Sequence, residues 1–217
     1  MRIIVTGATG LVGAEVVRQA ILDEDVTEIT ALVRKPLSIQ HEKLTTILHH
    51  DFLDYSKLTA VFKNIDCCIW CLGISQTHVN KVQYNCITYD YTLAAANAMI
   101  QANPGMTFMF LSGEGAMQNG KSNLLFGRVK GKTEKDLSQL PLKKLFISRP
   151  AGIKPIHKNP STAFLNKLVI PFYPLVELIA PRYVISSVQL AKAMLKIVKQ
   201  NSEKVIWSNT ELKNLAQ

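Results

Sequence analysis

The sequence predicts an α/β fold, a doubly wound parallel sheet with a small additional region towards the C-terminus. Three observations support this fold class. Short apolar runs alternate with longer amphipathic stretches, which is the pattern of βαβ units. A glycine-rich loop follows the first apolar run and opens the first amphipathic stretch. No internal repeat or low-complexity linker divides residues 1–217, so we expect one domain.

The elements follow in order from the spacing of apolar residues. The opening run RIIVTG is typical of a strand, and LVGAEVVRQAIL after it repeats apolar residues at helical spacing. By the same criteria, we expect strands at residues 2–7, 28–34, 45–51, 66–73, 106–113 and 143–150. We expect helices at residues 11–22, 55–63, 89–102, 123–139 and 186–200.

Local signals support individual elements. The run DCCIWCLG, residues 66–73, is apolar almost throughout, which favours a buried strand. The helix at 89–102 ends at Asn103-Pro104-Gly105, where proline and glycine interrupt helical structure. Residues 123–139 form a polar helix and residues 186–200 an amphipathic one, so both are expected to pack on the sheet through one face.

Composition and charge narrow the function classes. The formal net charge is +9, but lysines and arginines are scattered without a nucleic-acid-binding motif, so we expect no nucleic-acid partner. The N-terminal sequence has no signal-peptide pattern. The apolar stretch 164–181 is interrupted by Lys167, Glu177 and three prolines, so we expect no membrane span but a pocket cover or an oligomer contact. A cytoplasmic protein is the resulting expectation.

The four cysteines have two interpretations. Cys68 and Cys71 form a C-x-x-C pair, which in some proteins is a redox site. Here the pair lies inside an apolar run with no nearby group to lower a thiol pKa, which favours core packing. No second pair of Cys or His has zinc spacing, so we expect no metal site.

The loop TGATGLVG carries the clearest functional signal. Its glycines permit a tight turn, a close approach of backbone to a diphosphate, and packing of the helix on the strand. The start of the helix then offers N–H groups and a positive dipole end to phosphate. The residues expected to bind the cofactor here are Gly7, Thr9, Gly10, Leu11, Val12 and Gly13.

The spacing G-x-x-G-x-x-G in this loop resembles that of extended and atypical short-chain dehydrogenases/reductases. The resemblance covers most of the chain, and it is greatest to small NAD(P)-binding, nucleoside-diphosphate-sugar epimerase-like members. It implies a Rossmann fold, a nicotinamide cofactor, oxidoreductase chemistry and an unknown small-molecule substrate.

The end of the second predicted strand indicates which cofactor is bound. An acidic residue there would accept hydrogen bonds from the ribose 2′-hydroxyl of NAD. This chain instead has Arg34 and Lys35, and such cations can bind a 2′-phosphate. We therefore expect NADP, with NAD as a possible alternative; Arg34 simply facing water is the competing interpretation.

The resemblance implies further cofactor contacts. In the family, an acid after the third strand binds the adenine amino group, which points to Asp51 beside Phe52. The backbone after the fourth strand passes the adenosine, at Cys71, Leu72 and Gly73. Asp51 as a helix N-cap is the alternative, although Asp54 suits that role better.

The catalytic region departs from the family pattern. Family reductases use Ser, Tyr and Lys, with Tyr four residues before Lys on one helix face. Ser112 and Lys130 match, Lys130 being expected at the nicotinamide ribose, but Phe126 stands at the Tyr position. No Tyr-x-x-x-Lys occurs anywhere in the chain, so proton transfer would need a substitute. Ser112, Ser122 and Tyr84 are the candidates.

The rest of the site is expected after the last predicted strand. By resemblance, Pro150, Ala151 and Gly152 pass beside the nicotinamide, and a segment of about 153–182 lines the substrate side. Arg149 could contact an anionic substrate or pack in a loop. Apolar walls are expected from Phe164, Leu168, Phe172 and Tyr173.

Three functions remain open on the sequence alone. The first is an NADP-dependent oxidoreductase with an unusual proton donor. The second is a cofactor-binding redox sensor or scaffold without turnover, which the missing tyrosine favours. The third is a sugar-nucleotide epimerase, although few residues follow Gly152 to form a nucleotide-sugar pocket.

Overall fold

A computed structural model describes residues 1–157, 179–200 and 202–217. In these residues a seven-stranded parallel sheet has the order β3-β2-β1-β4-β5-β6-β9. Its strands are β1 (Arg2–Thr6), β2 (Glu28–Val33), β3 (Leu44–Leu48), β4 (Cys67–Trp70), β5 (Thr107–Leu111), β6 (Lys144–Arg149) and β9 (Ile206–Ser208). A second, two-stranded parallel sheet pairs β7 (Gly152–Lys154) with β8 (Val184–Ser186).

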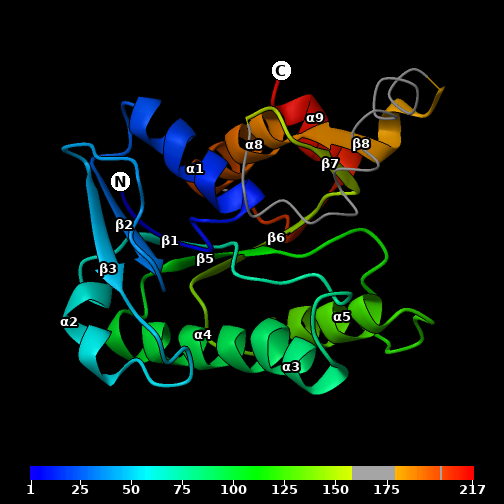
Figure 1. Ribbon diagram of the computed structural model, residues 1–217, viewed down its shortest axis with the longest axis horizontal. Coiled ribbons are helices and arrows are strands. Elements are labelled where there is room, and N and C mark those ends of the chain that lie inside the picture. Colours follow the sequence, from blue (N-terminus) through cyan, green and yellow to red (C-terminus); the bar gives the residue numbers. More distant parts are fainter. Residues whose placement is uncertain (158–178, 201) are drawn as a thin grey trace.

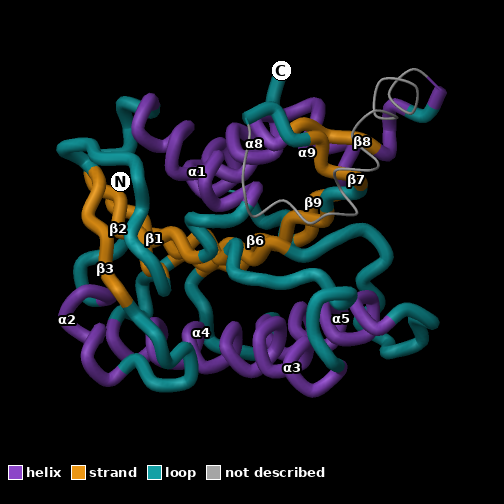
Figure 2. Tube along the Cα trace, in the orientation of Figure 1, coloured by secondary structure: helices purple, strands orange, loops and turns teal. Residues whose placement is uncertain are grey.

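Helices cover both faces of the large sheet, so the doubly wound α/β fold is confirmed (Figures 1 and 2). One face carries α1 (Leu11–Leu22), α8 (Ser187–Lys199) and α9 (Asn209–Leu215). The other carries α2 (Thr59–Phe62), α3 (Lys81–Asn85), α4 (Tyr91–Ala102) and α5 (Leu125–Leu137). Short 3₁₀ turns lie at Ser56–Leu58 and Pro181–Tyr183.

The alternation of side chains along each strand produces two cores. In β1, Ile3 and Val5 point towards α1 and α8, whereas Ile4 points to the opposite face. Aromatic residues concentrate on that opposite face, where Trp70 stacks on Phe108 with ring centroids 6.1 Å apart. Because both faces of the sheet are buried, its central strands are mostly apolar, which explains runs such as CCIW.

Several elements were missed by the sequence analysis. The strands β7, β8 and β9 have three residues each, too few to show a periodic pattern. The helix predicted at 89–102 is longer: α3 leads through a π-helical turn, Cys86–Asp90, directly into α4. A π-helical turn inserts one residue into a helix and often marks a functional site.

Candidate functional site

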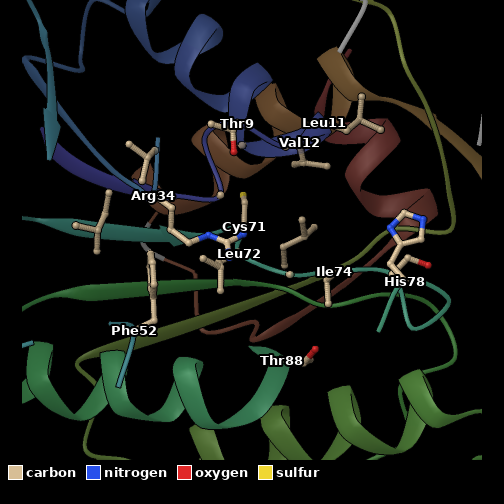
Figure 3. Close-up of a pocket in the computed structure, with 18 of the residues that line it drawn as sticks. Thr9, Leu11, Val12, Arg34, Phe52, Cys71, Leu72, Ile74, His78 and Thr88 are labelled. Carbon is tan, nitrogen blue, oxygen red and sulfur yellow. The ribbon is translucent and has the colours of Figure 1, made fainter. Parts of the chain in front are cut away.

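A cleft of about 940 Å³ lies at the carboxyl ends of β1, β2 and β4 (Figure 3). The strand order reverses between β1 and β4, the point at which doubly wound sheets bind ligands. The predicted cofactor residues that line it are Gly7, Thr9, Gly10, Leu11, Val12, Gly13, Arg34, Lys35, Phe52, Cys71, Leu72, Gly73 and Lys130. The cleft therefore brings together predicted residues from five separate segments of the chain.

The glycine loop is packed too tightly for a side chain at Gly7 or Gly13. Gly7 has a positive φ of 65°, and a Cβ there would lie 2.5 Å from the carbonyl oxygen of Cys71. A Cβ on Gly13 would lie 2.3 Å from the carbonyl oxygen of Gly7. Gly10 caps α1 without a side-chain hydrogen bond, which leaves room for an anion at the helix start. The loop is thus tightly turned and packed against the segment after β4, with the start of α1 free of a side-chain cap.

Cations gather at the end of the cleft beyond β2 and β3. Arg34 and Lys35 follow β2 and line the cleft, with Arg34 directed into it in Figure 3. His50, after β3, lines the same end and was missed by the sequence analysis because a single histidine there has no motif. Asp51 is exposed and does not line the cleft; its Oδ1 accepts a hydrogen bond from the Leu53 amide at 2.9 Å.

The middle of the cleft is formed by the chain after β4. The Leu72 amide donates a hydrogen bond to Thr6 Oγ1 at 3.2 Å, which fixes this segment beside β1. Burial raises the pKa of the Cys71 thiol to about 12, and it also raises the pKa values of Cys67 and Cys68. Thiols that hold their protons are poor nucleophiles, which supports core packing over redox chemistry for this C-x-x-C pair.

Lys130 lies in the wall of the cleft. Its Nζ donates hydrogen bonds to the carbonyl oxygens of Leu111 at 3.2 Å and Ser112 at 2.8 Å. Burial lowers the pKa of Lys130 to about 8, and the negative charge of Glu134 opposes this shift. The side chain is therefore held in the cleft wall, with its ammonium group within reach of a ligand in the cleft.

The Ser112 hydroxyl points away from the cleft. It donates to the carboxylate of Glu134, which is fully buried and also forms a two-pronged ion pair with Arg149. Gly113 takes the position that faces Lys130, because a Cβ there would lie 3.9 Å from the lysine Nζ. Ser112 is thus a partner of a buried network, and Arg149 is held inside that network.

Phe126 also lies outside the cleft lining. Its amide donates to Gln76 Oε1 at 3.0 Å, and its ring fills the space beside Gly115, whose Cβ would lie 3.3 Å from the ring. The other two candidate proton donors are buried. Ser122 Oγ accepts a hydrogen bond from the Leu124 amide, and Tyr84 is 2% exposed. Burial raises the pKa of Tyr84, which weakens it as an acid.

Thr88 is a cleft residue that the sequence did not reveal. It sits on the π-helical turn, which packs on α5, and it is 4% exposed. Its Oγ1 makes no hydrogen bond of normal geometry among the described residues, although its interaction with the Tyr84 hydroxyl partly offsets the raised pKa of that tyrosine, and Figure 3 shows the side chain at the lower side of the cleft. Buried hydroxyls are normally hydrogen-bonded, so a ligand group is a natural partner.

Residues 150–152, after β6, lie close to the cleft without lining it. Pro150 accepts a hydrogen bond from the Glu114 amide at 2.8 Å, and the Ala151 amide donates to Asn209 Oδ1 at 3.0 Å. Gly152 pairs with Val184 in the small sheet, and Ile153 is the residue that reaches the cleft. The predicted apolar walls at Phe164, Leu168, Phe172 and Tyr173 lie outside the described residues.

Comparison with known proteins gives three findings. A family model described as NAD(P)H-binding matches residues 7–130. The leucinostatins biosynthesis cluster protein T of Purpureocillium lilacinum is 32% identical over 160 residues, 71% of this chain and 58% of that protein. Protein FMP52, mitochondrial, of Meyerozyma guilliermondii is 25% identical and aligns with 100% of this chain and 96% of its own. This chain thus spans little more than half of the first relative.

The solved structures agree with the fold. MoeE5 in complex with UDP-glucose and NAD has a TM-score of 0.72 at 14% identity, covering 100% of this chain and 81% of that one. Identity this low supports a shared fold alone. Within the described residues, no helix has the length and apolar character needed to cross a bilayer.

Proposed function

Since the chain belongs to the NAD(P)H-binding family and is an atypical member of the short-chain dehydrogenases/reductases, we propose that it binds NADP(H) in the described cleft and acts as an oxidoreductase. The observation that carries the proposal is the cleft itself, which joins the glycine loop, two cations and Lys130. The ligand class fits because Gly7 and Gly13 allow the tight turn and close packing of the loop, and Gly10 begins α1 without a side chain, so that backbone N–H groups at the helix start can reach a diphosphate.

Each group of cleft residues has a separate binding role in this proposal. The glycine loop and the start of α1 bind the diphosphate through backbone N–H groups. Arg34 and Lys35 bind the 2′-phosphate, and Lys130 donates to the nicotinamide ribose. The bound nicotinamide supplies hydride chemistry. The contacts of Asp51, Pro150, Ala151 and Gly152 with the cofactor stay predictions, as does the catalytic role of Ser112.

Removing the two cations should change cofactor preference. In Arg34→Ala/Lys35→Ala, we expect the Kd for NADPH to rise about 10- to 100-fold, because charge-assisted hydrogen bonds contribute roughly 1.5–3 kcal/mol. The Kd for NADH should stay within about twofold, since that cofactor has no 2′-phosphate. Calorimetric titration of both cofactors measures the difference.

The matched control is Lys57→Ala/Lys63→Ala, which removes the same charge from exposed positions away from the cleft. Its affinity for NADPH should equal that of the wild type. An equal loss in both double variants would mean that net charge, and not a 2′-phosphate site, sets the affinity.

Thr88 gives a second test of binding in this cleft. In Thr88→Val, we expect the free protein to unfold at nearly the same temperature, because the buried hydroxyl makes no hydrogen bond of normal geometry in the free protein. The stabilisation by NADPH should shrink, with Kd rising about 2- to 10-fold for one lost hydrogen bond. Thermal unfolding with and without NADPH measures both effects.

Thr92→Val is the control for this substitution. Thr92 is also buried, but its Oγ1 donates to the Thr88 carbonyl oxygen at 2.8 Å. We expect it to leave the NADPH-induced shift unchanged. If Thr88→Val behaves in the same way, the Thr88 hydroxyl makes no contact with the cofactor.

A cofactor-binding protein without turnover is the second candidate. Phe126 favours it because a phenyl ring has no exchangeable proton, and the hydrogen bond of the Ser112 hydroxyl to Glu134 also favours it. Bound NADPH that is never oxidised by carbonyl compounds would support this candidate. A sugar-nucleotide epimerase has less support, since the likeness to epimerases extends only to the fold.

The domain organisation and location belong to the same proposal. We propose that residues 1–217 form a single domain and that a segment around 153–182 lines the substrate side of the site. The cytoplasmic location and the oligomeric state stay predictions. The word mitochondrial in the name of FMP52 describes that relative.

A further inference from the structure

The nicotinamide end of the proposed site needs a proton donor that the usual positions do not supply. Position 126 carries a phenyl ring, and the Ser112 hydroxyl is bound to Glu134. A carbonyl that accepts a hydride must also gain a proton on its oxygen. The donor therefore has to come from another side chain that lines the cleft.

The titratable groups of the cleft leave few choices. In the described residues they are Arg34, Lys35, His50, Cys71, His78 and Lys130. The first three follow β2 and β3, at the end assigned to the 2′-phosphate. Cys71 holds its proton up to a pKa of about 12, and the Lys130 ammonium is already engaged with two carbonyl oxygens.

His78 lies on a loop that is attached to the start of α5. Its amide donates to the Ser75 carbonyl oxygen at 3.0 Å, which closes a turn. Gln76, two residues earlier, accepts the hydrogen bond from the Phe126 amide at 3.0 Å. This contact holds the loop against the first turn of α5, where Phe126 takes the position of the family's tyrosine. In Figure 3 the imidazole lies beyond Ile74, at the opposite end from Arg34 and Phe52.

Solvent access suits His78 to repeated proton transfer. Its side chain is exposed although it lines the cleft, so water can return a proton after each turnover. An imidazole ring can both give and accept a proton, which a general acid must do in each turnover.

We propose that His78 is the catalytic acid of a carbonyl reduction in this cleft, in place of the absent tyrosine; this rests on the proposed NADP(H) oxidoreductase function. The imidazolium gives its proton to the carbonyl oxygen while the carbonyl carbon accepts a hydride from the dihydronicotinamide. A C–H and an O–H bond form, the carbonyl π bond breaks, and NADPH becomes NADP⁺. The neutral imidazole then regains a proton from water.

The test uses the whole chain with NADPH and two carbonyl probes, benzaldehyde and phenanthrenequinone. In His78→Gln we expect kcat to fall about 10²- to 10⁴-fold, the usual contribution of a general acid, with the Kd for NADPH within about threefold of wild type. The pH profile of kcat should differ between the wild type and His78→Gln, because only the wild type carries the proton-donating ring. His41→Gln, at an exposed histidine outside the cleft lining, should behave as wild type.

Histidine NMR signals provide a readout without turnover. The signals lost in His78→Gln should move when NADP⁺ is added to wild type, whereas those lost in His41→Gln should not. Unmoved His78 signals, an unchanged kcat in His78→Gln, or bound NADPH that neither carbonyl oxidises would each overturn the proton-donor role while cofactor binding stands. Failure of the wild type to bind NADPH would refute the proposed function as well.

Discussion

Gly7→Ala is expected to abolish measurable NADPH binding. A Cβ at this position would lie 2.5 Å from the Cys71 carbonyl oxygen and would meet a φ of 65° that L-residues rarely adopt. The loop must therefore move, and its amides lose their alignment on the diphosphate. Since a hydrogen bond to a charged group contributes roughly 1.5–3 kcal/mol, losing two of them raises Kd about 100-fold or more. Calorimetry of purified protein measures the loss.

Gly120→Ala is the control that shows the effect of backbone strain alone, without a change in the glycine loop. Gly120 also has a positive φ, 73°, but nothing lies within 4 Å of its added Cβ, and it does not line the cleft. We expect a lower unfolding temperature and unchanged NADPH affinity. If Gly7→Ala bound NADPH as tightly as Gly120→Ala does, the glycine loop would not be the diphosphate site.

Glu134→Ala should give the largest loss of stability. The carboxylate is fully buried, accepts from Ser112 and from Gln118 Nε2 at 3.2 Å, and pairs with Arg149, whose side chain is 24% exposed. Removing it leaves a mostly buried guanidinium without its counter-charge. Breaking such a pair costs about 3–5 kcal/mol in the free energy of unfolding. Urea denaturation measures this change.

Asp25→Ala is the control for the loss of a carboxylate. Asp25 pairs with Lys199 at 2.8 Å, but its side chain is 73% exposed, so solvent screens the interaction. We expect a much smaller loss of stability than in Glu134→Ala. Similar losses in the two variants would contradict the buried network as a source of stability.

The order of the central elements could be predicted because it depends on local patterns. Strands buried on both faces, such as Cys67–Trp70, are apolar along their whole length, and α8 shows its amphipathic spacing directly. The seven-stranded sheet is nevertheless completed by β9, Ile206–Ser208. Three residues carry no periodicity, so that strand is determined by its pairing with β6 and not by its own sequence.

The glycine loop could be predicted because the residues that form it are consecutive in the sequence. The environment of Ser112 could not, because side-chain direction at the end of β5 determines whether residue 112 or 113 faces Lys130. Thr88 was hidden for a related reason: the π-helical turn changes which residues of the helix face the cleft. Such features depend on contacts between segments distant in sequence.

The parallel sheet also governs how the chain can reach its native state. β1 leaves the ribosome first, yet its partner β4 begins at Cys67, and β5 and β6 follow still later. The entropy cost of closing long loops must be overcome before these long-range pairings form. We therefore expect slow refolding, during which β1 can pair with β2 on one edge before β4 pairs with the other. During that interval its unpaired edge is exposed to other nascent chains, which makes chaperone binding during synthesis advantageous for this fold.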